Sequence, residues 1–199
     1  MALISLAVFY SCQPEPIDPI ETDYVLLGGV KWAKTNLCKP KTFAKSNEEI
    51  PAYFQFNRKM GWYVDGETVI NFEGDTVWNN EPYISGDWEK INDPCPDGWR
   101  VPTMDELEKL TNIYTYWGEL DGVNGRFYLQ EDQEIFLPAL GYLLNLDGSI
   151  QEVSRYGYYW SSNSYGDENA HKLDLGINHI GMHYDRKNFG FPIRCVKED

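Results

Sequence analysis

The sequence lacks the short motifs that mark common metal and catalytic sites. It has no CxxC pair and no cysteine–histidine cluster at zinc spacing, so we expect no structural metal site. It also has no GxSxG, no HExxH and no glycine-rich phosphate loop. Acidic groups such as Glu131, Asp132 and Glu134 form a polar run that is typical of a solvated loop. Acid–base catalysis needs two carboxylates held in contrasting environments, and the sequence shows only this polar run. We therefore expect neither catalysis nor a cofactor.

Basic residues are scarce. The chain has 17 Lys and Arg against 31 Asp and Glu, which gives a formal net charge of -14. This balance opposes the phosphate neutralisation on which most nucleic-acid binding depends, so we expect no nucleic-acid partner. Aromatic residues are abundant instead, with 7 Trp and 14 Tyr. Such side chains either fill an irregular core or face outward on a binding surface.

The N-terminal end has the features of an export signal. Residues 1–11 (MALISLAVFYS) form an apolar run too short to span a membrane, which is typical of a signal peptide. This run and the Ser11-Cys12 pair resemble a bacterial lipobox, which implies lipidation at Cys12, contact with the membrane through that lipid anchor only, and an exported protein at the outer-membrane surface. Residues 12–22, rich in proline and acid, predict an extended tether.

The positively charged start of a signal peptide is missing, because no Lys or Arg precedes Lys31. Either the translation start lies upstream of Met1, which we favour, or the apolar run is not a signal. In both cases residues 23–199 are long enough for one domain with a full core.

An α+β fold is expected for residues 23–199, with short antiparallel strands, long loops and one clear helix. Thr103 and Glu106 form a T-x-x-E capping box, and Leu107, Leu110 and Ile113 recur at helical spacing. These residues predict a helix near 103–115. Short apolar segments between turn signals predict the strands, and the aromatic stretch 76–88 is expected to be a surface loop.

Five segments resemble one known family, the "major paralogous domain" named from Fibrobacter succinogenes and widespread in exported Bacteroidetes lipoproteins. The segments are 29–37 (GVKWAKTNL), 93–103 (DPCPDGWRVPT), 136–142 (FLPALGY), 157–162 (GYYWSS) and 193–197 (IRCVK). The family is similar to C-type lectins, which implies a single C-type-lectin-like domain. In that fold a cysteine near the first helix is bridged to one in the last strand, which implies a Cys95–Cys195 disulfide and a free Cys38.

Two activities of related folds are not expected here. The formylglycine-generating enzymes use paired cysteines with copper, and this chain has no such pair. Calcium-dependent lectins use a Glu-Pro-Asn tripeptide and a later Trp-Asn-Asp. The nearest sequence here, Asn80-Glu81-Pro82, has a different order, and Trp160 is followed by serines. Calcium-bridged sugar binding is therefore not predicted.

The C-terminal part gathers adaptable polar residues. If residues 178–184 form a strand, Ile180 and Met182 lie on one face and His179 and His183 on the other. A metal site there would need a third ligand near both histidines, so we expect either a ligand-binding face or a plain solvent face. The candidate ligand-binding residues are Asn163, Tyr165, Asp167, Asn169, His171, Asp174, Asn178, His179, His183, Tyr184 and Asn188.

This composition resembles the variable region of diversity-generating-retroelement proteins, in which mutagenesis of adenines yields Asn, Tyr, Ser, His and Asp on a rigid frame. The resemblance implies a frame of Trp160, Leu173, Leu175, Gly190 and Arg194. The predicted function is a non-catalytic surface lipoprotein that binds a glycan or protein ligand through its C-terminal region. The alternative is an assembly subunit, such as an accessory or tip component of a fimbria-like fibre.

Overall fold

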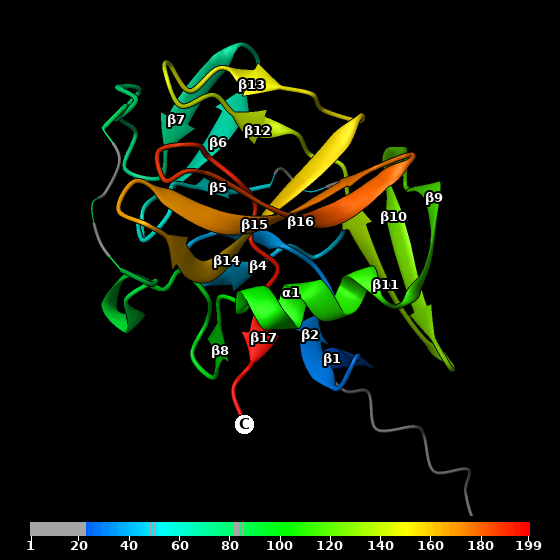
Figure 1. Ribbon diagram of the computed structural model, residues 1–199. Helices are drawn as coiled ribbons and strands as arrows, with labels where there is room; N and C mark the ends of the chain where they lie inside the picture. Colours follow the sequence, from blue (N-terminus) through cyan, green and yellow to red (C-terminus); the bar gives the residue numbers. More distant parts are fainter. Residues whose placement is uncertain (1–22, 48, 50, 82–83, 85) are drawn as a thin grey trace, which may run out of the picture.

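The computed structural model describes residues 23–47, 49, 51–81, 84 and 86–199. The predicted signal peptide at 1–11, the lipidation site at Cys12 and the tether at 12–22 lie outside the described residues. Among the residues that are described, no helix is long and apolar enough to cross a lipid bilayer. Short antiparallel sheets make up most of the described fold, and the α-helix α1 lies at the front of the view in Figure 1.

The α+β expectation is wrong, because strands account for almost all of the regular structure. The described residues form six small antiparallel sheets, with one α-helix, α1 (Met104–Thr111), and one 3-10 turn, η1 (Lys90–Asn92). The fold is therefore all-β-like. Strands of two to four residues, which include β5 and β12, are too short to show an alternating pattern that sequence reading could detect.

Two three-stranded sheets contain the longest strands. The first has the order β14 (Tyr156–Tyr165), β15 (Asn169–Gly176) and β16 (His179–Arg186). The second has the order β11 (Gln133–Pro138), β10 (Val123–Gln130) and β9 (Tyr114–Leu120). In Figure 1, β9–β11 stand to one side of β14–β16, and α1 lies beneath the β14–β16 sheet.

The smaller sheets complete the fold. A four-stranded sheet has the order β1 (Tyr24–Leu27), β2 (Val30–Ala33), β17 (Val196–Lys197) and β8 (Trp99–Arg100). Another has the order β5 (Tyr53–Phe54), β6 (Gly61–Asp65) and β7 (Thr68–Asn71). The two-stranded sheets are β3 (Leu37–Lys39) with β4 (Thr42–Phe43), and β12 (Tyr142–Leu143) with β13 (Ile150–Gln151).

Helix α1 begins where the capping box predicts. The Thr103 side chain accepts a hydrogen bond from the Glu106 amide at 3.2 Å, and the Glu106 carboxylate accepts from the Thr103 amide at 2.7 Å. The helix ends earlier than predicted, because Asn112 caps it and Tyr114 already starts β9. Its buried Leu107 and Leu110 belong to the apolar cluster that also holds residues of β14 and β15.

Buried Arg194 joins several of the segments that resemble the paralogous family. It donates to the backbone oxygens of Ala33 at 3.0 Å, Lys34 at 2.7 Å and Phe136 at 2.9 Å, and to Asn36 Oδ1 at 2.7 Å. Burial lowers the pKa of the Arg194 guanidinium to about 10, which leaves it charged at neutral pH. Each of the three guanidinium nitrogens therefore donates at least one hydrogen bond, which compensates the buried charge where these segments meet.

A disulfide joins Cys95 to Cys195, as the family resemblance implied, and Cys38 is free. The bridge connects positions 100 residues apart, next to β8 and β17. Both half-cystines are fully buried in a second apolar cluster with Trp160 and Phe191. Closing a loop of this length stabilises a fold by roughly 4 to 5 kcal/mol in the chain-entropy account.

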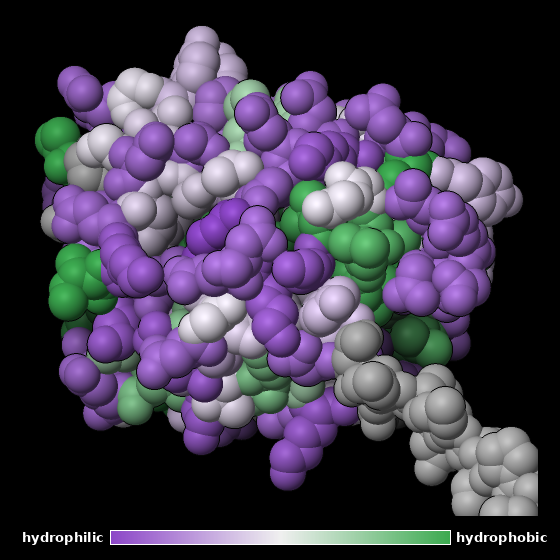
Figure 2. Space-filling view, turned by 90° about the horizontal axis from the view of Figure 1, so that it is seen from below, coloured by the Kyte–Doolittle hydropathy of each residue, from purple (hydrophilic) through white to green (hydrophobic). Residues whose placement is uncertain are grey.

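The surface is mostly hydrophilic, in line with the net charge. Figure 2 shows purple side chains over most of the face seen from below, with one larger green, hydrophobic patch right of the centre of the view.

Candidate functional site

The sheet β14–β15–β16 holds most of the candidate ligand-binding residues and has two distinct faces. Ile180 and Met182 pack against the apolar cluster that contains α1, whereas His179 and His183 are exposed on the other face. This is the alternation that the sequence predicts. In the register of the sheet, His179 pairs with Gly176 and His183 pairs with Lys172. We call these the helix face and the outer face.

At one end of the sheet, the helix face extends beyond the core and carries three ring side chains. Tyr165 and Tyr184 stack with their centroids 4.2 Å apart, and His171 meets the Tyr165 ring edge-on at 5.2 Å. Tyr165 is 48% exposed and Tyr184 is 52% exposed. These three side chains, called the aromatic group below, present flat apolar surfaces with hydroxyl groups and ring nitrogens at their edges. Such amphipathic surfaces suit binding to partners with mixed polarity.

Asn163 lies two residues before Tyr165 on β14, and its side chain has a structural role. Its Oδ1 accepts a hydrogen bond from the Met104 amide at 2.8 Å, at the start of α1. Its Nδ2 donates to Asp87 at 3.2 Å, and Asp87 also accepts from the Ser164 amide at 2.8 Å. Asn163 therefore links the helix, the sheet and the described part of the predicted loop 76–88.

The turn between β14 and β15 contains Asp167 and precedes Asn169. Asp167 is exposed, and Asn169 is half-buried at the start of β15. The fully buried Lys187 donates to the backbone oxygens of Gly166 at 3.2 Å and Asp167 at 2.8 Å. Its ammonium also lies 5.3 Å from the centre of the Phe56 ring. Burial lowers the pKa of the Lys187 ammonium, although nearby Asp167 opposes the change. Lys187 thus holds the turn beside the aromatic group.

On the outer face, Asp174, His179 and His183 come together. Each offers a ligand atom, and these atoms all lie within 4.8 Å of one another. The buried Lys172 ammonium pairs with Asp174 and lies 3.3 Å from Asp185. Burial raises the pKa of the Asp174 carboxyl above its usual range, while the charge of Lys172 opposes the rise. We call Asp174, His179 and His183 the outer triad.

The last two candidate residues differ in their surroundings. Asn178 is exposed in the turn before β16. Asn188 is only 3% exposed, so it does not reach the surface that the sequence analysis assigned to it. Its backbone oxygen accepts from Gln55 at 3.0 Å, and its side-chain amide donates to the Asn80 backbone oxygen. Asn188 therefore belongs to the frame.

The five residues expected to form a fixed frame are buried: Trp160, Leu173, Leu175, Gly190 and Arg194. Trp160 shows how the frame is held. Its indole N–H donates to the Phe54 backbone oxygen at 2.8 Å, and its ring packs against Phe56 and Phe191. The aromatic group thus rests on a well-packed support.

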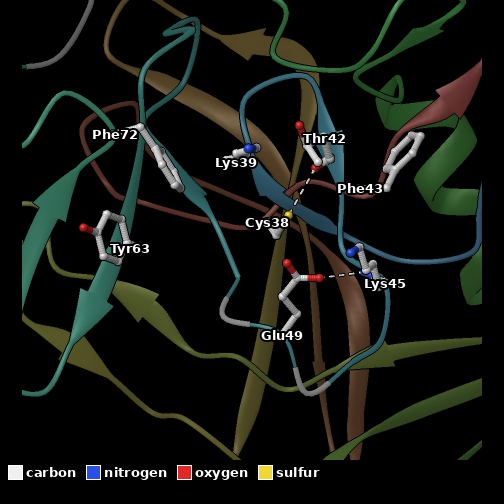
Figure 3. Close-up of a pocket in the computed structure, with 8 residues that line it drawn as sticks. All are labelled: Cys38, Lys39, Thr42, Phe43, Lys45, Glu49, Tyr63 and Phe72. Carbon is white, nitrogen blue, oxygen red and sulfur yellow. Dashed lines mark hydrogen bonds between the residues drawn. The ribbon is translucent and has the colours of Figure 1, made fainter.

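A cavity lies elsewhere, between β3–β4 and β6–β7 (Figure 3). It has a volume of about 540 Å³ and is lined by Cys38, Lys39, Thr42, Phe43, Lys45, Glu49, Tyr63 and Phe72. Cys38 faces Glu49, whose carboxylate accepts from the Lys45 amide at 2.7 Å. Burial, followed by the Glu49 carboxylate, raises the pKa of the Cys38 thiol. A thiol that stays protonated at neutral pH is a poor nucleophile. Cys38 therefore does not have the lowered thiol pKa that is typical of a reactive cysteine.

Sequence reading missed Lys172, Gly181, Asp87 and Lys187. Lys172 and Asp174 alternate with Leu173 and Leu175, so a period-two pattern could have placed them together on the outer face. Gly181 lies opposite Asp174, a relation that needs the strand register. Asp87 and Lys187 act across long sequence separations, which no local pattern reveals.

Comparison with known proteins adds one partial match. Residues 119–196 match a family described as a domain of unknown function (DUF8237). This segment covers less than half of the chain and includes the complete sheet β14–β16, strands β10 and β11, and only the last two residues of β9. No curated protein and no solved structure matches the chain.

Proposed function

We propose that this protein is a non-catalytic recognition module that binds a glycan or protein ligand through the aromatic group. The observation that carries the proposal is the stacked pair Tyr165–Tyr184, whose rings are each about half exposed. Tyrosine is among the residues that contribute most to binding energy in interfaces. Clustered exposed rings also mark interaction sites more often than single exposed ones.

The support beneath the rings favours this role. Lys187 fixes the turn that follows Tyr165, and Asn163 fixes the strand that precedes it. Contacts that are already ordered lose less conformational entropy when a ligand binds, so a held pair of tyrosines binds better than a mobile one. The same logic underlies antibody surfaces, where tyrosines are displayed on a rigid scaffold.

The proposal includes display at the bacterial surface through a lipid at Cys12. It is supported by the order of residues 1–22: an apolar run, a cysteine and an acidic proline-rich tether. The proposed membership of the Fibrobacter-named paralogous family is supported by the five segments quoted above. Arg194, from the last segment, hydrogen-bonds to the first and third of them.

Diversification by a retroelement is part of the same proposal. The exposed Tyr165, Asn178 and Tyr184 would vary, whereas Asn188 would stay fixed because it is buried. The flanking DNA tests this directly. A template repeat and a reverse transcriptase gene beside this gene would support diversification, and neighbouring fimbrial genes would favour the assembly role.

The binding experiment compares the wild type with Tyr165→Ala/Tyr184→Ala on a glycan array and against cell-surface protein extracts. Tyr114→Ala is the matched control, because Tyr114 is 72% exposed on β9 in the other long sheet. We expect the double variant to bind its targets roughly tenfold or more weakly, as loss of a hot-spot pair predicts. Equal binding by wild type and double variant would contradict the proposal, as would an equal loss in Tyr114→Ala.

A second candidate is the assembly subunit, and the observation that favours it is the edge strand β9. In the described chain β9 pairs only with β10, and it exposes Tyr114 and Tyr116. An exposed edge strand can pair with a strand from another subunit. If this role holds, Tyr114→Lys/Tyr116→Lys should abolish cross-linked multimers on cells, while Tyr165→Ala/Tyr184→Ala leaves them intact.

A further inference from the structure

The outer triad is assembled by the register of a single hairpin. Asp174 on β15 pairs with Gly181 on β16, and His179 and His183 flank Gly181 two positions away on either side. Since side chains two apart in a strand share a face, all three ligand groups lie on the outer face, opposite the apolar cluster that contains α1. Their strands are joined by hydrogen bonds, so the backbone positions of the ligands are fixed relative to one another.

Gly181 has no side chain, so the space between the three ligand groups of the outer triad stays open. A Cβ atom at this position would lie 3.4 Å from His183 Nε2 and 3.7 Å from His179 Cε1. Both imidazoles therefore lean over the glycine, and their ring centres are 5.3 Å apart although they are four residues apart in an extended strand. A bulky side chain in place of Gly181 would occupy the point where the two rings converge.

The ligand atoms of the outer triad indicate which class of metal ion would bind there. Two imidazole nitrogens and one carboxylate oxygen suit zinc and similar transition metals, whereas calcium and magnesium prefer oxygen ligands alone. Tetrahedral zinc ligands at about 2.0–2.1 Å from the ion lie about 3.4 Å from one another. The triad atoms, at up to 4.8 Å, need only small side-chain rotations to reach this spacing, and both histidines are exposed and free to make them.

The charges around the triad also favour a cation. Asp174 and Asp185 flank one ammonium, that of Lys172, so this cluster has an excess of negative charge. Lys172 bonds to Oδ1 of Asp174, and within the described residues no donor reaches Oδ2, which is left for an ion. A group that holds a ligand carboxylate in place is a common outer partner of metal sites.

We propose that Asp174, His179 and His183 bind one divalent transition-metal ion of the zinc class, with water or a ligand group completing the coordination. The site lies on the outer face, opposite the aromatic group, so it is independent of the proposed recognition function. From the sequence no metal site is expected here, because no third ligand lies close to both histidines along the chain. Asp174, brought opposite Gly181 by the strand register, is that ligand.

The test is isothermal titration of the full chain with zinc chloride, with every protein carrying Cys12→Ser and Cys38→Ser so that free thiols do not bind the metal. We expect one zinc ion per chain. His179→Gln/His183→Gln should weaken binding by roughly tenfold or more, because two of the three protein ligands are lost. Gly181→Leu should do the same without removing a ligand. His171→Gln is the matched control, because His171 lies on the helix face and should leave zinc affinity unchanged.

A spectroscopic readout separates loss of the site from loss of folding. Cobalt(II) should give visible absorption bands with the thiol-free parent chain and with His171→Gln, but not with Gly181→Leu, and circular dichroism should show that all three proteins are folded. Absence of zinc binding to the parent chain would overturn the proposal. Equal weakening by His171→Gln, unchanged affinity in Gly181→Leu, or calcium binding as tight as zinc binding would each overturn it too.

Discussion

Tyr165 and Tyr184 stack with ring centres 4.2 Å apart although β15 separates their strands in the sheet. The contact crosses β15 on the helix face, where His171 meets the Tyr165 ring. Three strands thus contribute one ring each to an exposed group. Each ring limits the rotation of its neighbour, so the surface is ordered before any ligand arrives.

The first prediction separates this surface from its frame. Tyr165→Ala/Tyr184→Ala should lower the free energy of unfolding by only about 1 kcal/mol, the contribution of an aromatic pair. Trp160→Ala should lower it by about 3 to 5 kcal/mol, because Trp160 is fully buried among rings. Urea unfolding followed by circular dichroism measures both. If the tyrosine variant loses as much stability as Trp160→Ala, the two tyrosines are part of the core and the recognition proposal fails.

The second prediction concerns the start of α1 and its dependence on pH. Arg100 donates two hydrogen bonds to Glu106, at 2.7 and 2.8 Å. Burial raises the pKa of the Glu106 carboxyl, but the bonds from Arg100 and Thr103 outweigh it and hold the pKa below its usual value. Because the folded pKa is depressed, the ionised carboxylate stabilises the fold above its unfolded pKa, and this stability is lost as pH falls through the folded value.

Glu106→Gln should therefore lower the unfolding free energy by about 1 kcal/mol at pH 7, a value reduced by the partial exposure of Arg100. The difference from wild type should persist down to about pH 5 and shrink below about pH 4. Urea unfolding at several pH values measures it. Glu108→Gln is the control, since Glu108 is exposed on the same helix. A gap that widens in acid would contradict the assigned pKa direction.

The third prediction follows from the raised pKa of Cys38. Burial and the Glu49 carboxylate both disfavour the thiolate, so at pH 7.5 iodoacetamide should alkylate Cys38 more slowly in the folded chain than in urea. The midpoint of the rate against pH should lie above about 8.5, the ordinary cysteine value. Mass spectrometry of a Cys12→Ala chain gives the rates. Glu49→Gln should move the midpoint downward, and a midpoint below that of the unfolded chain would refute the assignment.

The fourth prediction concerns the N-terminal cysteine. Radiolabelled palmitate should enter the protein expressed in bacteria from its native gene and should not enter Cys12→Ala. Cys38→Ala is the matched control, because it removes a cysteine outside the lipobox-like sequence and should label normally. Equal labelling of wild type and Cys12→Ala would remove the lipoprotein proposal.

Local signals predicted the parts of the fold that depend on neighbouring residues. The capping box placed the start of α1 at Thr103, and alternation placed Ile180 and Met182 opposite His179 and His183. The end of α1 was wrong, because Tyr114 continues the helical spacing although Asn112 caps the helix and β9 begins. Helix propensity does not reveal a strand that is stabilised by pairing with another segment, which for β9 is β10.

The site was harder to predict because it depends on tertiary contacts. Asn188 has the composition of a surface residue, yet Gln55 and Asn80 bind it in the interior. Asp174 lies near the two histidines only through the pairing of β15 with β16. The prediction of an α+β fold was wrong for a related reason. The short strands β8 and β17, for example, pair with each other although Arg100 and Val196 lie far apart in the chain.

The Cys95–Cys195 bridge also determines what happens when the chain is cut. The closed loop contains both strands that bear the stacked tyrosines, and its turns include the exposed residues Gly166 and Asp167. Exposed turns are preferred sites for proteases. A cut there leaves two fragments that remain covalently joined through the buried disulfide, with Tyr165 on one and Tyr184 on the other. A nicked molecule therefore keeps both halves of its aromatic surface together and sheds neither until a reductant reaches the bridge.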